Sequence, residues 1–174
     1  QFDEHVSAAG RIGRDTLVIA SETGLYRFHL GTGERSLVVP LEAENPVTRS
    51  NDGRADPWGG FWIGTMGKKA EPGAGAIYRF YRGELRKLVA GVTISNSICF
   101  APDRSAAYHT DTKVGKIMRQ PLAAADGWPE NETEAEGGAQ HAVSLAALCG
   151  LGDVGDVGGR RRMCGAGNAG QDTT

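Results

Sequence analysis

The chain has 174 residues and a formal net charge of −2, and no basic patch stands out, which argues against nucleic acid as a partner. It contains no run of the roughly 18 apolar residues that a membrane-spanning helix needs, so no membrane partner is expected. The three cysteines, Cys99, Cys149 and Cys164, form no Cys-x-x-Cys pair. This spacing argues against a structural zinc site and suits a reducing compartment, so the expected localisation is cytoplasmic.

Three similar units follow one another along the first three-quarters of the chain. Each unit has an apolar strand, a gap, a glycine and a second apolar strand that ends near an arginine. The strand pairs are 17–21 with 24–28, 61–65 with 75–80, and 107–110 with 115–119. The units recur at roughly 40–50 residues, the size of one β-propeller blade. The predicted fold class is therefore all-β, and the repeat favours a β-propeller over a β-sandwich.

Turn-forming residues separate the predicted strands. Residues 56–60, Asp-Pro-Trp-Gly-Gly, combine a proline that is preset for a turn with glycines that accept positive φ. Residues 81–84 predict a further hairpin, and residues 102–105 separate an apolar strand from the next one. We predict no amphipathic helix before residue 128.

The character of the sequence changes after Trp128, the last aromatic residue. Residues 129–136 form an acidic stretch that we expect to be loop or linker, and 141–148 could form a short helix. Residues 150–170 are dominated by Gly, Asp, Val and Arg, with no strand periodicity. We therefore predict a partial propeller over residues 1–128, followed over 129–174 by an acidic linker and a Gly-rich, disordered tail. Our hypothesis for this break is a reading-frame slip or a misassembled end, which an unbroken frame in the encoding DNA would contradict.

The densest polar motif is Thr48-Arg49-Ser50-Asn51-Asp52-Gly53. Side chains alternate along an extended segment, so Arg49 and Asn51 should point the same way. A guanidinium fork beside an amide can hold sugar hydroxyls or a carboxylate, and Asp52-Gly53 would then begin a turn. Taken in isolation, the motif fits a simple turn beside a surface arginine better than a binding site.

Asn96 is the second candidate, because it opens the apolar strand that contains Cys99, itself expected to be a small buried hydrophobe. An amide oxygen is a hard ligand that suits calcium, magnesium or another divalent ion. The alternative is an asparagine that bonds its own backbone at the strand entry. On the next strand, His109 is expected to be buried and hydrogen-bonded, and Asp111 to face a channel or cap a turn.

Residues 49–66, RSNDGRADPWGGFWIGTM, closely resemble the signature of the gluconolactonase, regucalcin and luciferin-regenerating-enzyme family. Residues 94–103 and 107–112 resemble the next block of that family, and the similarity covers about residues 5 to 128. The resemblance implies a six-bladed β-propeller, of which about three blades are present here. It also implies one divalent metal ion (calcium, zinc, magnesium or manganese) and hydrolysis of a sugar lactone. In that chemistry the metal polarises the lactone carbonyl, and a carboxylate acts as general base on water.

The resemblance places Arg49 and Asn51 on the substrate-contacting pair and Asn96 on a metal ligand. Lys69 falls where some family members place a glutamate in the substrate site. A cation there would suit an acidic or phosphate-bearing sugar, and the alternative is that Lys68 and Lys69 are solvated loop charges.

The family's carboxylates have no counterpart here in a matching motif. Glu4 lies after the blade that supplies the metal-binding glutamate, and Asp153 and Asp156 lie outside any Pro-Asp-Gly block. The catalytic base is therefore unknown, and we expect this chain by itself to be inactive as a metal-dependent lactonase. Two alternatives remain open: a non-enzymatic calcium-binding or regulatory protein of the same family, and a truncated product without function.

Overall fold

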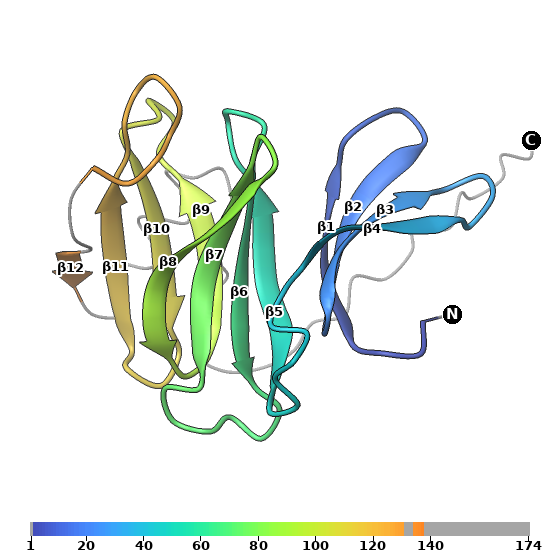
Figure 1. Ribbon diagram of the computed structural model, residues 1–174. Helices are drawn as coiled ribbons and strands as arrows, with labels where there is room; N and C mark the ends of the chain where they lie inside the picture. Colours follow the sequence, from blue (N-terminus) through green and yellow to red (C-terminus); the bar gives the residue numbers. More distant parts are fainter. Residues whose placement is uncertain (1, 131–133, 138–174) are drawn as a thin grey trace, which may run out of the picture.

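The computed structural model describes residues 2–130 and 134–137, which form three antiparallel sheets of four strands each (Figure 1). Within every sheet the strands follow their order in the chain. The first sheet contains β1 (Val6–Arg11), β2 (Thr16–Ser21), β3 (Gly24–His29) and β4 (Arg35–Pro40). The second contains β5 (Thr48–Ala55), β6 (Phe61–Gly67), β7 (Gly75–Tyr81) and β8 (Glu84–Val92). The third contains β9 (Ser95–Phe100), β10 (Ala106–Asp111), β11 (Lys116–Pro121) and β12 (Glu134–Gly137).

The three repeated strand pairs of the sequence are the two middle strands of each sheet: β2 with β3, β6 with β7, and β10 with β11. The all-β prediction is confirmed, and each sheet is one blade of a partial β-propeller. The predicted turns at 56–60, 81–84 and 102–105 all separate consecutive strands. Within the described ranges there is no helix with the length and apolarity needed to cross a membrane.

The first strand of each sheet lies against the first strand of the next sheet. β1 contacts β5, and β5 contacts β9, so the three sheets stand side by side as Figure 1 shows. We call β1, β5 and β9 the inner strands. Their polar sequences contrast with the apolar middle strands, and their side chains bond from sheet to sheet.

The middle sheet is buried on both faces. Successive side chains on β6 and β7 point in opposite directions, so each strand contributes to two separate cores. The core toward the first sheet contains Val18, Ala20, Leu25, Leu41, Phe61, Ile63, Ala76 and Tyr78. The core toward the third sheet contains Trp62, Ile77, Val92, Ile98, Ala107 and Leu122. This double burial explains why β6 is an unbroken run of apolar and small residues rather than an alternating strand.

Gly64 allows β6 to lie close to β9. A Cβ atom at this position would lie 2.0 Å from Ser95 Oγ, and Ser95 is fully buried. We expect Gly64→Ala to lower the free energy of unfolding by about 1–3 kcal/mol through overpacking, as measured by urea denaturation. The matched control is Gly13→Ala in the exposed β1–β2 turn, where the nearest atom would be 3.7 Å from the new Cβ. Equal losses in the two variants would show that close packing at Gly64 is not the cause.

Two segments differ from the sequence-based expectation. The turn predicted at Asp52-Gly53 is wrong, because β5 continues through it with a β-bulge between Ser50 and Gly53. The polar groups of this segment are satisfied by bonds to β9 instead of by a local turn.

The acidic stretch 129–136, expected to be loop, contains the start of β12, which pairs with β11 as the outer strand of its sheet. An edge strand needs only backbone pairing on one side and therefore carries no apolar signal. The segments 141–148 and 150–170 lie outside the described residues.

Candidate functional site

Arg49 and Asn51 lie together at the start of β5. Arg49 Nη1 donates hydrogen bonds to Asn51 Oδ1 at 3.1 Å and to the Ser50 carbonyl at 2.8 Å. Asn51 Nδ2 in turn donates to the Ser95 carbonyl at 2.7 Å, which fixes the amide orientation. Within the described part of the chain, nothing bonds to Nε or Nη2 of Arg49, so one edge of the guanidinium is held and the other is open. A fixed guanidinium with an open edge suits a carbonyl, hydroxyl or carboxylate ligand.

Side-chain bonds join the three inner strands at this level. Ser7 Oγ donates to Ser50 Oγ at 2.7 Å, and Ile98 N donates to Asp52 Oδ2 at 2.8 Å. Sequence reasoning missed Ser7, Ser50 and Asp52 as members of the site. The bonded partners are 43 and 46 residues apart, and Asn51 and Ser95 are 44 apart. Each bond therefore joins similar positions of successive repeats, and that spacing is the signal that could have found them.

Asn96 is the second residue of β9 and is exposed. Its Oδ1 accepts a hydrogen bond from Ser97 N at 3.0 Å, and its Nδ2 lies 3.5 Å from Thr112 Oγ1. The amide oxygen that a metal would need thus already bonds the neighbouring backbone. Among the side chains that the structure describes, no group of three or more His, Cys, Asp or Glu residues could hold a metal ion. Within the described residues, the Asn96 amide is therefore a single neutral donor with no such cluster of ligands around it.

Lys69 lies in the loop between β6 and β7. The register pairs Thr48 with Gly67, which brings this loop to the same end of the sheet as Arg49. Lys69 is exposed and forms no ion pair with the rest of the described chain. Its neighbour Lys68 is different, because it forms an ion pair with Glu22 of the first sheet. Hydrogen bonds from Lys68 and from His5 hold the pKa of Glu22 at about 2.

Glu42, which sequence reasoning also missed, anchors the start of β5. Its Oε2 accepts a hydrogen bond from Thr48 Oγ1 at 2.5 Å, and its Oε1 accepts one from Tyr78 OH at 2.6 Å and one from Thr65 Oγ1 at 3.2 Å. Burial and the adjacent Glu42 carboxylate raise the pKa of the Tyr78 hydroxyl. These three bonds tie the segment before β5 to β5, β6 and β7.

Strand β10 carries two further polar residues, His109 and Asp111. Asp111 accepts backbone hydrogen bonds from Thr93, Ile94 and Lys113, so it caps the adjoining loops. Burial works to raise the pKa of Asp111, but these hydrogen bonds outweigh it, and the pKa lies below its ordinary value. His109 is buried as predicted, yet neither ring nitrogen has a hydrogen-bond partner among the described residues, so that part of the prediction is wrong. Asp153 and Asp156 lie outside the described residues.

Comparison with known proteins decides the family. Residues 1–143 match the SMP-30/Gluconolactonase/LRE-like region. The chain belongs to this family.

The matched part of the chain covers less than half of each relative compared here. Over 133 residues the chain is 41% identical to a protein assigned as a sugar lactone lactonase in Rhizobium meliloti (strain 1021), with 72% of this chain and 45% of the relative covered. It is 36% identical to the 6-deoxy-6-sulfogluconolactonase of Pseudomonas putida, with 74% and 44% covered. The crystal structure of regucalcin, a calcium-binding protein from Agrobacterium tumefaciens, is 46% identical with a TM-score of 0.75, and 77% of this chain and 45% of that one are covered. The chain thus spans about half the length of these family members.

Proposed function

We propose that this chain is part of a lactonase-type hydrolase that opens sugar lactones, and that Arg49 and Asn51 hold the sugar. The observation that supports this role is the fixed Arg49–Asn51 pair with one open guanidinium edge. The relatives named for lactones at 41% and 36% identity supply the substrate class.

Lys69 is proposed as a third substrate contact. It lies in the loop at the Arg49 end of the sheet, and its ammonium group has no partner among the described residues. One relative is named for a sulfonated gluconolactone, a sugar with a fixed negative charge. An unpaired cation at this position favours a lactone that carries such a group.

The divalent metal that the resemblance implies also remains a proposal, with Asn96 as one donor. A single amide oxygen binds calcium, zinc, magnesium or manganese weakly when no carboxylate joins it. We therefore expect this chain alone to bind sugar acids without turning lactones over. The cytoplasmic localisation stays a prediction as well.

Gluconate, the stable product of gluconolactone hydrolysis, is the probe for the sugar site. Arg49→Ala should weaken gluconate binding to the full 174-residue chain by at least about tenfold, since a charge-assisted hydrogen bond contributes about 1.5–3 kcal/mol. Isothermal titration calorimetry measures the affinity, and circular dichroism checks the fold. The matched control is Arg14→Ala, in the exposed β1–β2 turn, which should leave the affinity unchanged. Equal affinity of wild type and Arg49→Ala would remove Arg49 from the site.

A pH-stat assay tests whether this chain alone turns lactones over. Metal-stimulated lactone hydrolysis would contradict the expectation that it does not.

A calcium-binding role without catalysis is the second candidate, favoured by the 46% identity to a protein described as calcium-binding. Calorimetric titration of the chain with calcium tests it. Binding that Asn96→Ala abolishes, without lactone turnover, would support this role. The control is Asn45→Ala, because Asn45 is likewise an exposed asparagine whose Oδ1 bonds the nearby backbone.

A further inference from the structure

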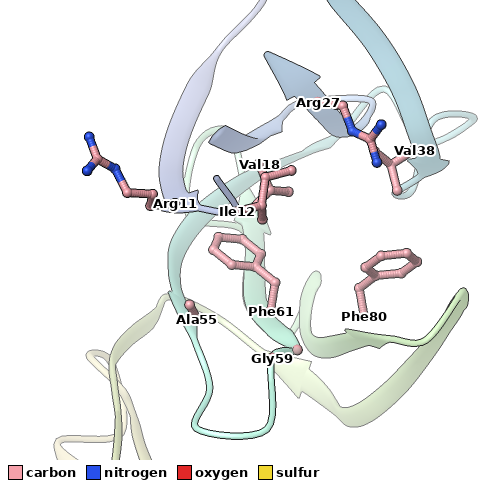
Figure 2. Close-up of a pocket in the computed structure, with 10 residues that line it drawn as sticks. Arg11, Ile12, Val18, Arg27, Val38, Ala55, Gly59, Phe61 and Phe80 are labelled. Atoms are coloured by element: carbon pink, nitrogen blue, oxygen red, sulfur yellow. The ribbon is translucent and has the colours of Figure 1, made fainter. Parts of the chain in front are cut away.

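A pocket of about 340 Å³ opens between the first and second sheets. Its apolar walls include Val18 and Val38 from the first sheet and Phe61 and Phe80 from the second. In Figure 2 the two phenylalanine rings border the space from opposite sides, and Arg27 lies above Phe80 beside Val38. Pockets of this size with mostly apolar walls and few polar groups are typical small-molecule sites.

This pocket is separate from the Arg49–Asn51 site. Ala55, at the end of β5, contributes to its wall, whereas Arg49 is six residues earlier on the same strand. Six residues of an extended strand span roughly 20 Å. The pocket therefore lies at the opposite end of the inner strands and is not part of the proposed lactone site.

Arg27 borders the pocket from β3, and its side chain is exposed there. It is two residues after Leu25 on β3, so both side chains point toward the second sheet, and Leu25 is fully buried there. Its cross-strand partner is the core residue Val18. In the described part of the chain, no carboxylate pairs with Arg27, nor with Arg11, the other charged residue that borders the pocket. Both charged groups at this apolar pocket are thus unpaired cations.

We propose that the pocket binds a small monocarboxylate with an aromatic or otherwise apolar body. The body packs between Phe61 and Phe80, where it removes apolar surface from water. The carboxylate accepts hydrogen bonds from the Arg27 guanidinium, whose fork matches a carboxylate. Arg11 stands at the rim, extends away from the rings in Figure 2, and adds positive potential at the entrance.

The test uses 3-phenylpropionate and its neutral counterpart 3-phenylpropan-1-ol, titrated into the full chain by calorimetry. We expect the carboxylate to bind and the alcohol to bind at least about fivefold more weakly. Arg27→Gln should remove this preference by weakening carboxylate binding about fivefold to tenfold. Val38→Trp should fill the space and abolish binding of both compounds, and because Val38 is 40% exposed, this variant should still fold.

Two controls locate the effect. Arg14→Gln removes a cation that does not border the pocket, and Arg49→Ala removes the cation of the sugar site; neither should change binding of 3-phenylpropionate. Failure of wild type to bind the acid, or unchanged binding in Val38→Trp, would overturn the pocket assignment. Equal binding of acid and alcohol would overturn the claim that the pocket selects a carboxylate. An unaltered preference in Arg27→Gln would overturn the claim that Arg27 binds that carboxylate. A loss in Arg49→Ala would place the compound at the sugar site instead.

Discussion

Asp56→Asn is expected to lower the free energy of unfolding by about 3–5 kcal/mol, because it leaves a buried arginine without its counter-charge. Arg79 Nε lies 2.7 Å from Asp56 Oδ2, and both side chains are 0% exposed. The two Nη atoms of Arg79 are buried and have no hydrogen-bond partner in the part of the chain that the structure describes. The carboxylate of Asp56 is therefore the group that balances this charge.

Aromatic rings surround the rest of the guanidinium. The Cζ atom of Arg79 lies 4.5 Å from the centre of the Tyr81 ring, 4.6 Å from Trp128 and 5.9 Å from Trp58. Ring faces attract a cation, but this attraction is weaker than that of a buried carboxylate. Asparagine keeps the Oδ1 atom that accepts hydrogen bonds from Trp58 N and Gly60 N, so the 56–60 turn should persist in the variant.

Urea denaturation followed by tryptophan fluorescence measures the loss. The control is Glu84→Gln, which breaks an ion pair with Arg86 whose side chains are about half exposed, and it should change stability by about 0–1 kcal/mol. The double variant Asp56→Asn/Arg79→Met removes both charges and should recover much of the stability. If Asp56→Asn and wild type unfold at the same midpoint concentration of urea, the ion pair does not contribute this stability.

Acidification between pH 6.5 and 4 is expected to destabilise the protein by roughly 3 kcal/mol through His109 alone. Burial lowers the pKa of His109 from 6.5 to about 4, and the nearby Asp111 carboxylate offsets only part of that effect. The folded state therefore binds the proton less readily than the unfolded chain does. The contribution of neutral His109 to the free energy of unfolding is therefore fully present above pH 6.5 and is lost as the pH falls toward 4.

His109→Phe isolates this contribution, because phenylalanine keeps a ring of similar size and cannot titrate. Neither nitrogen of His109 makes a hydrogen bond to residues 2–130, so the variant should be about as stable as wild type at pH 7.5 or more so. The free energy of unfolding, measured in urea at a series of pH values, should fall less steeply below pH 6.5 in this variant. His29→Gln, at an exposed position, should keep the wild-type slope. Identical slopes for wild type and His109→Phe would rule out His109 as the source.

The middle strands of each sheet could be predicted from the sequence because they are the most buried strands, and burial requires a run of apolar residues. β6 is buried throughout, and its apolar run is visible in the sequence. The outer strand β4 is almost entirely exposed, and β12 is an acidic segment held by backbone pairing, so neither leaves an apolar pattern. β5 was mistaken in part for a turn because Asn51 and Asp52 are common turn residues. Their actual partners are on β9, which no local pattern reveals.

The site was predicted in the same uneven way. The alternation rule placed Arg49 and Asn51 side by side, and their hydrogen bond bears this geometry out. Their roles toward a sugar, like those of Lys69 and Asn96, came from resemblance and remain proposals. Glu42 could not be found, because its three hydroxyl partners are 6, 23 and 36 residues away and share no motif with it. The carboxylate is recognisable only once the second sheet has brought Thr65 and Tyr78 together.

The up-and-down strand order of the three sheets has a consequence for how the chain folds. All strand pairs within a sheet are consecutive in the chain, so hydrogen bonding requires closure of short loops only. Such hairpins form within microseconds, whereas contacts between inner strands such as β1 and β5 require chain segments more than 40 residues apart to meet. We therefore expect the hairpins to form first and the transition state to lie in the docking of one preformed sheet on the next.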